Sequence, residues 1–478
     1  MLVLAICCMS LFIVGLDVTV VNVALPSIQH DLHASVSGLQ WVVAAYSLVL
    51  ASLLMLSGST ADRVGRRRTF QVGLALFTLG SLLCSLAPSL GALVAFRMMQ
   101  AIGGSMLNPV AMSIITNTFT ERAERARAIG IWGGVVGLSM ALGPVVGGLL
   151  VTSVGWRSIF WINIPVGLAA ILLTALFVPE SKAPRARRFD PAGQLLVVIT
   201  LGSLVYGIIE GPGRGWTSPL ILGCFAASLL AAAGFVWYER RREEPLLDTR
   251  FFRSVPFSGA TLIAVSSFAA LGGFLLVSTL YLQDVRGLSA LHAGLYMLPM
   301  AAATAICSPL SGRIVGSRGP RLPLLGAGIA ILVSALSLTR LSAGTSAGSL
   351  VISYLIFGLG FGLVNAPITN TAMSGMPRAQ AGVAAAVAST SRQVGSALGV
   401  AVVGSVVESA LGGASLRTGF AMASHVGWWV IAGCGLAVLV LGLMTSGTRA
   451  RRTAERVAAE FEPAEDGAEL APAENMPV

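Results

Sequence analysis

Charged side chains are scarce in this chain of 478 residues. Only 11% of the residues are Asp, Glu, Lys or Arg, whereas 55% are hydrophobic. In a soluble domain about a quarter of the residues are charged. A chain so poor in charge cannot cover a water-facing surface, which excludes a soluble enzyme and an intrinsically disordered protein. Its length must therefore be divided among membrane-spanning segments.

Residue types that bind nucleotides or metals are also sparse. The single lysine, Lys182, lies outside any Gly-rich phosphate-binding loop, so no ATP site is predicted. The six cysteines stand in apolar stretches without a C-x-x-C pair, and the four histidines are scattered, which disfavours a disulfide framework and a metal site. No cluster of polar catalytic groups is recognisable. The sequence therefore predicts no cofactor, no metal and no enzymatic activity.

Long apolar runs are what the chain has in abundance. About 20 mainly apolar residues cross a bilayer as a helix, whereas the strands of a membrane barrel show only a weak alternation. The runs therefore predict an all-α integral membrane protein with fourteen spans. These spans are expected at residues 2–26, 38–59, 70–88, 91–117, 128–152, 158–178, 191–210, 218–238, 256–282, 291–311, 322–340, 348–374, 382–408 and 424–446.

The basic residues orient these spans. Of the 31 Lys and Arg residues, 24 lie in the connections after even-numbered spans and in the C-terminal tail, and only five lie in the other connections. Cytoplasmic loops carry such an excess, so we expect both termini in the cytoplasm. An odd number of spans would spoil this alternation. The placement of these basic residues indicates that the net charge of +10 serves interaction with the lipid bilayer rather than with nucleic acid.

A repeat divides the spans into halves. The loop after span 2 begins SGSTADRVGRRR and the loop after span 10 begins SGRIVGSRGPR, so that Gly58 and Gly65 match Gly312 and Gly319 at the same spacing. Repeated halves with a site at their interface are typical of secondary transporters. The expected domains are a six-helix bundle over 1–180, two inserted spans and cytoplasmic loops over 181–254, a second six-helix bundle over 255–446 and a disordered cytoplasmic tail over 447–478.

The first span contains an acidic residue, Asp17, in the stretch LDVTVVNVALP (Leu16–Pro26). A carboxylate inside a membrane is costly and usually faces a cavity or a partner, and desolvation favours its protonated form. We therefore expect Asp17 to exchange protons; the alternative is a carboxylate that reaches the outer interface. The stretch resembles the span-1 signature of the fourteen-span drug:proton antiporters of the major facilitator superfamily. That resemblance implies two six-helix bundles plus two additional central helices.

The fourth span begins RMMQAIGGS (Arg97–Ser105), which resembles the span-4 motif of the same superfamily. Arg97 stays charged and so needs a partner or water. The resemblance links Arg97 to proton coupling, and Gln100 would share its polar patch one turn away. The alternative is an arginine that reaches the outer headgroups.

The loop after span 2, GSTADRVGRRR (58–68), resembles the superfamily's loop 2–3 motif. The resemblance implies a conformational gate, in which Asp62 meets the N-terminal end of a helix in the opposite half and Arg66 pairs with an acidic residue near the end of span 4. The alternative is a positive-inside anchor alone. The implied gating residues are Gly58, Asp62, Gly65, Arg66, Glu121 and Glu124.

Span 5 contains GLSMALGPVVGG (Gly137–Gly148), which resembles the superfamily's antiporter motif. Proline bends a helix and glycine permits close helix contact, and the resemblance implies export by antiport. The motif residues are Gly137, Gly143, Pro144, Gly147 and Gly148. The stretch WRSIFWINIPVG (Trp156–Gly167) resembles a further subfamily signature, which we expect to be structural.

Polar residues elsewhere in the spans are candidates for a substrate cavity. Span 13 contains SRQVGSALG, a stretch that resembles the subfamily's span 13 and buries an arginine. The polar residues of span 2 could also line the cavity, and core packing is an equal alternative for them. The candidates are Gln40, Trp41, Tyr46, Gln100 and Arg392. The carboxylates of Glu210, Asp284 and Glu408 are expected to be solvated helix ends.

These observations predict a proton-coupled antiporter that exports amphipathic drugs or antibiotics by alternating access. We expect a multi-pass monomer in the cytoplasmic membrane, with small amphipathic molecules, protons and lipid as its partners. One alternative is an exporter of a single endogenous metabolite. The other is a non-transporting membrane receptor, which would need a large soluble domain that the sequence does not contain.

Overall fold

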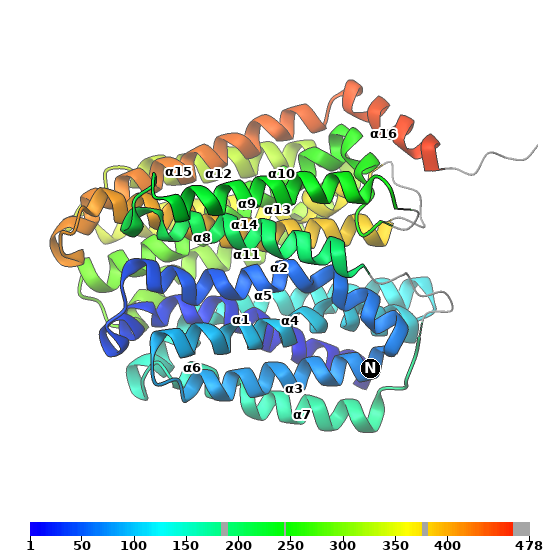
Figure 1. Ribbon diagram of the computed structural model, residues 1–478, viewed down its shortest axis with the longest axis horizontal. Helices are drawn as coiled ribbons and strands as arrows, with labels where there is room; N and C mark the ends of the chain where they lie inside the picture. The colour runs from blue at the N-terminus through cyan, green and yellow to red at the C-terminus, as the bar shows by residue number, and fades with distance from the viewer. Residues whose placement is uncertain (183–189, 243–244, 375–380, 462–478) are drawn as a thin grey trace, which may run out of the picture.

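The structure, a computed structural model, describes residues 1–182, 190–242, 245–374 and 381–461. All regular secondary structure within these ranges is helical, and the helices run along one common direction (Figure 1). The first group is α1 (Leu2–Leu32), α2 (Val36–Val64), α3 (Arg66–Ser85), α4 (Leu90–Thr118), α5 (Arg122–Ser153), α6 (Ser158–Trp161) and α7 (Asn163–Phe177).

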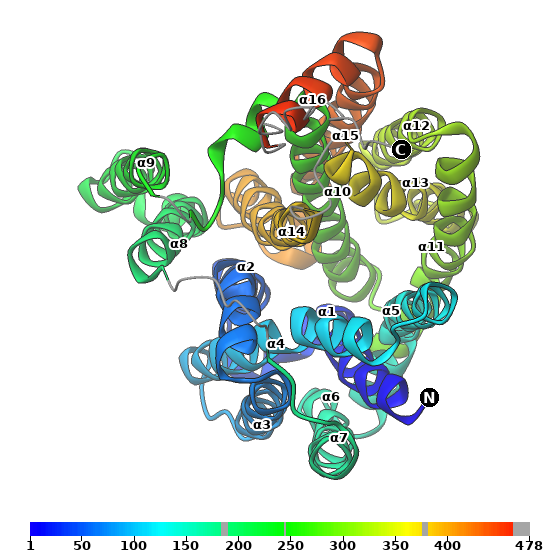
Figure 2. The same cartoon turned by 90° about the vertical axis from the view of Figure 1, so that its right-hand side faces the viewer.

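The next two helices, α8 (Pro191–Arg214) and α9 (Pro219–Glu239), form a pair on the outside of the bundle (Figure 2). Of the two, α8 lies beside α2 and α14. The second group is preceded by the short helix η1 (Thr249–Arg253). It consists of α10 (Val255–Leu280) with its extension η2 (Tyr281–Val285), α11 (Ala290–Arg318), α12 (Arg321–Leu338), α13 (Ala347–Met373), α14 (Ala381–Leu411) and α15 (Leu416–Thr445), followed by α16 (Thr448–Phe461).

Serine residues begin many of these helices. The hydroxyl oxygen of Ser35 accepts a hydrogen bond from the Gly38 amide at 3.1 Å, and Ser89, Ser218, Ser289 and Ser346 cap α4, α9, α11 and α13 in the same way. A side-chain oxygen at this position satisfies one of the free amides of the first turn. All five caps lie at the end of the bundle opposite the two chain termini. At that end, short polar loops with a capping serine therefore separate one long apolar helix from the next.

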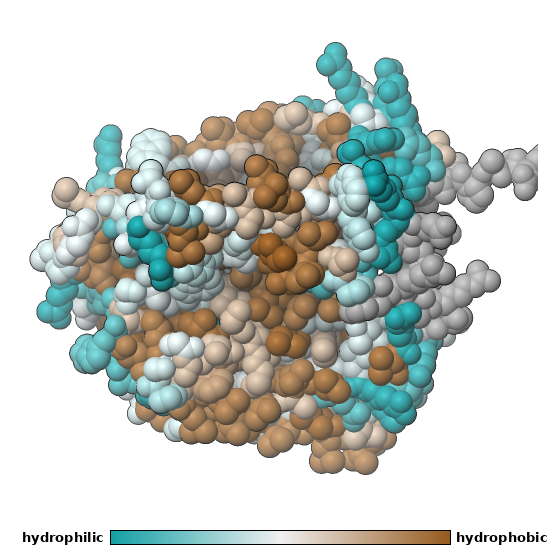
Figure 3. Space-filling view, viewed as in Figure 1, coloured by the Kyte–Doolittle hydropathy of each residue, from teal (hydrophilic) through white to brown (hydrophobic). Residues whose placement is uncertain are grey.

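In the described part of the chain, thirteen helices are long and apolar enough to cross a membrane. The expected span at 70–88 corresponds to α3, which is not among the thirteen because Arg68, Gln71 and Thr78 dilute its apolar run. The count of fourteen spans is therefore not confirmed, although the all-α membrane fold is. Figure 3 shows apolar surface across the middle and hydrophilic side chains towards the two ends, as a bilayer-embedded bundle requires.

The C-terminal tail differs from the expectation of disorder. Residues 448–461 form α16, which packs on η1 and α10 through the buried side chains of Ala450, Ala454 and Val457. Thr453 Oγ1 accepts a hydrogen bond from the Val255 amide at 3.0 Å, at the first residue of α10. The tail composition hides this apolar stripe, because arginines and glutamates surround it. Residues 462–478 lie outside the described residues.

The two helix groups meet at the end opposite the chain termini, which we name the closed end. There the Gln283 side chain donates a hydrogen bond to the Val23 carbonyl at 2.8 Å, and the Leu291 amide donates to Thr152 Oγ1 at 3.2 Å. The other end, which holds Met1 and α16 and faces the viewer in Figure 2, we name the open end. A Cβ atom added at Gly58, Gly130 or Gly312 would meet no neighbour within 4 Å there.

Candidate functional site

A buried ion pair joins α1 to α4. Arg97 Nη1 lies 2.5 Å from Asp17 Oδ2, and the two side chains are 2% and 1% exposed. Gln100 bridges the pair, because its Oε1 accepts from Arg97 Nη1 at 2.6 Å while its Nε2 donates to Asp17 Oδ1 at 2.9 Å. The structure thus brings Asp17 of span 1 together with Arg97 and Gln100, which the sequence already placed in one polar patch of span 4. Neither charged group reaches an outer interface, so that alternative was wrong for both.

Two further polar residues complete this network, and the sequence reasoning missed them. Asn163 Nδ2 donates to Asp17 Oδ1 and to Ser81 Oγ, each at 3.3 Å, and Gln100 Nε2 donates to the same Ser81 oxygen at 2.8 Å. Asn163 begins α7 directly after α6 ends. The signature WRSIFWINIPVG, interpreted as structural, therefore also supplies a contact to the acid. An amide inside an apolar span was the available signal.

Arg97 is held by more than its acid. Its Nε donates to the Val42 carbonyl at 3.3 Å, and its guanidinium carbon lies 4.2 Å from the centre of the Tyr46 ring. A cation above an aromatic face is attracted by the ring quadrupole. Tyr46 is fully buried here and packs under the arginine, so the core-packing alternative describes it rather than the cavity. A buried ion pair is favourable only when such additional contacts satisfy its remaining donors.

Glycines let the helices of this network approach each other. A Cβ atom at Gly80 of α3 would lie 2.7 Å from Gln100 Cα of α4, closer than real Cβ atoms come to other atoms. Gly103, in the span-4 motif, packs in the same way against the backbone of α3 at Phe77. Only a residue without a side chain permits this contact. Gly80 and the motif glycine Gly103 thus hold α3 against α4 at Gln100, which bridges the buried pair.

The antiporter motif of α5 connects α1 to the second group. Gly143 packs against Thr19, and a Cβ atom at Gly147 would lie 3.0 Å from the side chain of Val20. On the other side of the helix, a Cβ atom at Gly148 would lie 2.6 Å from the Ala290 carbonyl oxygen of α11. Three motif glycines are thus close helix contacts. The helix that bears Asp17 is thereby packed against the helix that touches the opposite half.

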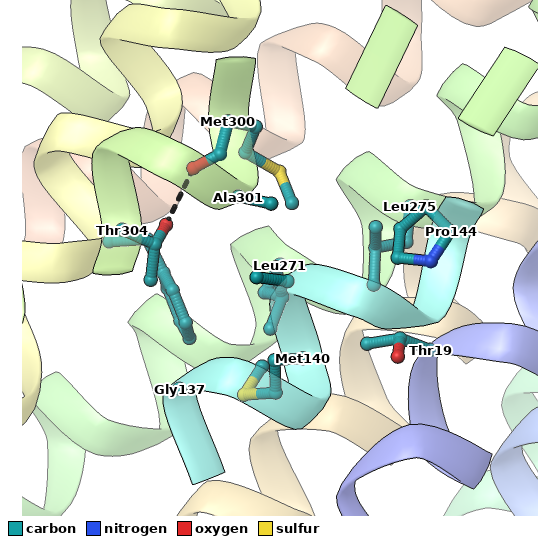
Figure 4. A pocket seen from close by; sticks show the side chains of 11 residues that line it. Thr19, Gly137, Met140, Pro144, Leu271, Leu275, Met300, Ala301 and Thr304 are labelled. Atoms are coloured by element: carbon teal, nitrogen blue, oxygen red, sulfur yellow. Dashed lines mark hydrogen bonds between the residues drawn. The ribbon is translucent and has the colours of Figure 1, made fainter. Parts of the chain in front are cut away.

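An apolar pocket lies between the two groups (Figure 4), and α1, α5, α10, α11 and α13 all contribute to it. The motif residues Gly137 and Pro144 line it, and Thr19 is two residues from Asp17 in α1. Methionine side chains adapt to ligands of different shape. The lining residues are Thr19, Gly137, Met140, Ala141, Pro144, Leu271, Leu275, Met300, Ala301, Thr304 and Phe361.

The expected gate residues lie at the open end. Arg66 forms its ion pair with Asp62, one turn away, at 3.1 Å. Glu121 and Glu124 are exposed, and in the described chain no ion pair joins them to Arg66. The expected pairing with the end of span 4 is therefore not present in this conformation. Arg66 is instead engaged by the nearer Asp62, one turn before it in the same loop motif.

Glu180, which follows α7, holds the gate loop in place. Its Oε1 accepts from the Arg67 amide at 3.1 Å and its Oε2 from the Arg68 amide at 3.3 Å, so it caps the start of α3. Gly65 has a φ of 127°, and an added Cβ atom would lie 2.6 Å from Glu180 Oε1. The motif glycine is thus required both by the backbone conformation and by the carboxylate beside it. No sequence pattern assigned a role to Glu180.

Two other cavity candidates lie at the closed end instead. Gln40 is fully buried against Gly404 of α14, and Trp41 Nε1 donates to Glu210 Oε1 of α8 at 2.9 Å. Glu210 also pairs with Arg214 at 3.2 Å, so it is not merely a solvated helix end. Packing therefore describes Gln40 and Trp41 in this conformation. The remaining candidate, Arg392, lies on α14 and contacts α13.

Known proteins place this arrangement among the membrane transporters. Residues 7–400 match the Major Facilitator Superfamily, and the chain belongs to that superfamily as a multi-pass, non-enzymatic transporter. It is 42% identical over 399 residues to multidrug resistance protein Stp of Mycobacterium tuberculosis, covering 84% of this chain and 74% of the relative. It is 39% identical over 405 residues to the tetracenomycin C resistance and export protein of Streptomyces glaucescens, covering 84% and 75%.

The fold is shared with a solved structure. A bacterial homologue of the human lysosomal transporter Spinster, in an inward-facing and occupied conformation, matches with a TM-score of 0.65. The match covers 94% of this chain and 96% of that one at 19% sequence identity. This likeness concerns the fold, whereas the drug-efflux relatives carry the information on subfamily.

Proposed function

We propose that this transporter is a proton-coupled antiporter that exports amphipathic drugs or antibiotics by alternating access. The observation that carries the proposal is the buried pair of Asp17 and Arg97, because an ionisable pair inside a membrane bundle is costly and is typical of proton pathways. The apolar lining of the pocket between the halves is of the kind that contacts the apolar part of an amphipathic substrate. The relatives named for multidrug and tetracenomycin C resistance support the substrate class.

Protonation of Asp17 is the coupling step in this proposal. The neutral acid no longer attracts Arg97, which keeps its contacts to Gln100 and the Val42 carbonyl. The contact between α1 and α4 is thereby weakened. Because α1 also lines the pocket through Thr19 and packs on the glycines of α5, its displacement reaches both the substrate and the contact with α11. Proton uptake and substrate binding thus exclude each other.

The orientation follows from charge. The open end holds the Arg-rich connections and both termini, so the positive-inside rule assigns it to the cytoplasm. The conformation described here is then the one that admits substrate from inside the cell. We propose that the protein works as a monomer, since each chain contains both halves and the pocket between them.

Asp17→Asn tests this function. Asparagine has nearly the same shape and cannot titrate, so the variant should insert normally and lose at least about tenfold of substrate-induced proton release. The measurement is the collapse of a pH gradient in inverted vesicles against a chemically broad compound panel. Asp31→Asn is the matched control, because Asp31 lies on the same helix but is exposed at the closed end beside Arg157. Normal coupled efflux by Asp17→Asn refutes proton coupling through Asp17, and a response to one metabolite only refutes drug export.

A further inference from the structure

Arg392 is a cation of the second half for which the described residues provide no acidic partner. One Nη2 group donates to Thr369 Oγ1 at 2.6 Å and reaches the Asn365 carbonyl at 3.5 Å, both on α13. Its Nε is buried and has no hydrogen-bond acceptor in the described chain. Among the same residues no carboxylate lies within 4.0 Å of the guanidinium. Arginine has five N–H donors and keeps its charge, so most of its binding capacity is unused.

The first half treats its arginine differently. Arg97 is neutralised by Asp17 at 2.5 Å and bridged by Gln100, so that half carries a closed, neutral pair. A charge within a membrane protein usually faces a cavity or a partner. Arg392 contacts only the neutral oxygens of Thr369 and Asn365 among the described residues. A bound ligand is therefore the natural source of its countercharge.

Its place in the bundle connects it to the pocket. Phe361 lines the pocket, and Asn365 and Thr369 follow it along α13 at one-turn intervals towards the open end. Arg392, eleven residues into α14, reaches these turns from the neighbouring helix. It thus stands between the apolar pocket and the end through which a substrate would enter. Its partners Asn365 and Thr369 lie one and two turns beyond the pocket residue Phe361, and an apolar pocket with a cation on this side is complementary to an amphipathic anion.

We propose that Arg392, together with Thr369, binds an anionic oxygen of the transported substrate, such as a carboxylate or an ionised phenol. The pocket takes the apolar part of the molecule. This inference rests on the proposed export function and narrows its substrate class. The planar guanidinium fits a carboxylate with two parallel hydrogen bonds. Export of one monoanion in exchange for one proton then moves two positive charges inward per cycle, so the membrane potential would drive the exchange.

A matched pair of probes tests the site without any proton gradient. Rhodamine B bears a carboxylate where its methyl ester bears a neutral group on the same ring system. Fluorescence anisotropy with purified protein should show that the wild type prefers the acid. Arg392→Gln should lose about tenfold in affinity for the acid, as expected for hydrogen bonds to a charged group, and should bind the ester within about twofold of the wild type. Retained ester binding shows that the variant is folded.

Two control variants and one competition measurement accompany this binding experiment. Arg392→Lys keeps the charge and loses the fork, so it should fall between the wild type and the Gln variant. Arg417→Gln changes an exposed arginine at the closed end and should alter neither affinity. Excess inorganic phosphate shows how general the anion site is. If phosphate displaces the acid but not the ester, Arg392 binds anions of any kind, and if it displaces neither, the anion must carry an apolar body. Both results keep an anionic ligand at Arg392.

Four outcomes overturn the proposal. They are equal affinity of the wild type for acid and ester, a preference for the acid that survives Arg392→Gln, binding of neither probe, and equal loss of both probes in a folded Arg392→Gln protein. None of these outcomes bears on proton coupling, which is tested by the proton release of Asp17→Asn in inverted vesicles. A wild type that binds acid and ester equally would still be able to exchange them for protons, so the two failures are distinguishable.

Discussion

Arg97 gathers contacts from three helices, and no other basic side chain could reproduce them. Its Nη1 donates to Asp17 of α1 and to Gln100 of its own helix, and its Nε donates to the Val42 carbonyl of α2, all from one planar group. A lysine ammonium is a compact point charge that can shed its proton when buried. The residue type, and not only its charge, is therefore fixed by the site.

Arg97→Lys should consequently reduce coupled transport at least tenfold, which corresponds to about 1.4 kcal/mol. The rate of substrate-induced proton release in inverted vesicles measures this. Arg157→Lys is the control, because Arg157 pairs with a partly exposed acid, Asp31, at the closed end. An Arg97→Lys variant that transports at the wild-type rate would show that only a positive charge is needed.

Gly65 is the second position where one residue type is imposed. Alanine there would adopt a left-handed backbone at a cost of about 1–2 kcal/mol, and its Cβ atom would lie 2.6 Å from the carboxylate that caps α3. Gly65→Ala should lower the thermal stability of the purified protein and slow transport. Gly58→Ala, in the same motif but with no neighbour within 4 Å, should leave stability nearly unchanged. Equal behaviour of the two variants would remove the steric argument.

At the scale of elements, the contact of α5 with α11 holds the closed end together. A Cβ atom at Gly148 would lie 2.6 Å from the Ala290 carbonyl oxygen, and Gly294 of α11 packs on the Pro144 carbonyl. The helices touch backbone to backbone at these points, so the contact has no space for an added side chain.

Gly148→Val should prevent this contact and shift the population towards conformations that open at the closed end. Labelling of a cysteine introduced at Ala290, which is buried at this contact, by a membrane-impermeant thiol reagent applied to intact cells should rise several-fold. Gly130→Val, on the same helix but with open space around it, serves as the control. Unchanged labelling in Gly148→Val would mean that the glycine does not hold the closed end.

The elements also show where sequence reasoning succeeds and where it stops. Helix positions followed from long apolar runs, and Asp17, Arg97 and Gln100 stood out because charged and amide groups are rare in such runs. Ser81 escaped because hydroxyl groups are common in membrane helices, and Asn163 escaped because it stands in a stretch that was interpreted as structural. The helix α16 was missed because its apolar stripe is diluted by surrounding charge. Contacts such as Trp41 with Glu210 join segments 169 residues apart, which no local pattern reveals.

At the scale of the whole molecule, orientation is the first property to test. Because the Arg-rich connections and the termini share the open end, we expect the C-terminus and that end in the cytoplasm. A reporter fused after Val478 should be active only inside the cell, and one inserted beside Arg286 only outside. A C-terminal reporter accessible only from the exterior would invert the assignment and, with it, the direction of entry.

The placement of the buried pair also has an electrical consequence. Asp17 and Arg97 belong to the same half of the bundle, so in the proposed proton-coupled cycle they travel together when the halves rock. While both are ionised, the moving half carries a dipole with no net charge and does little work against the membrane voltage. Once a proton neutralises the acid, the arginine moves as a bare charge, worth about 2.3 kcal/mol for each 100 mV that it traverses. Capacitive currents recorded from a supported membrane should therefore accompany only the proton-loaded reorientation.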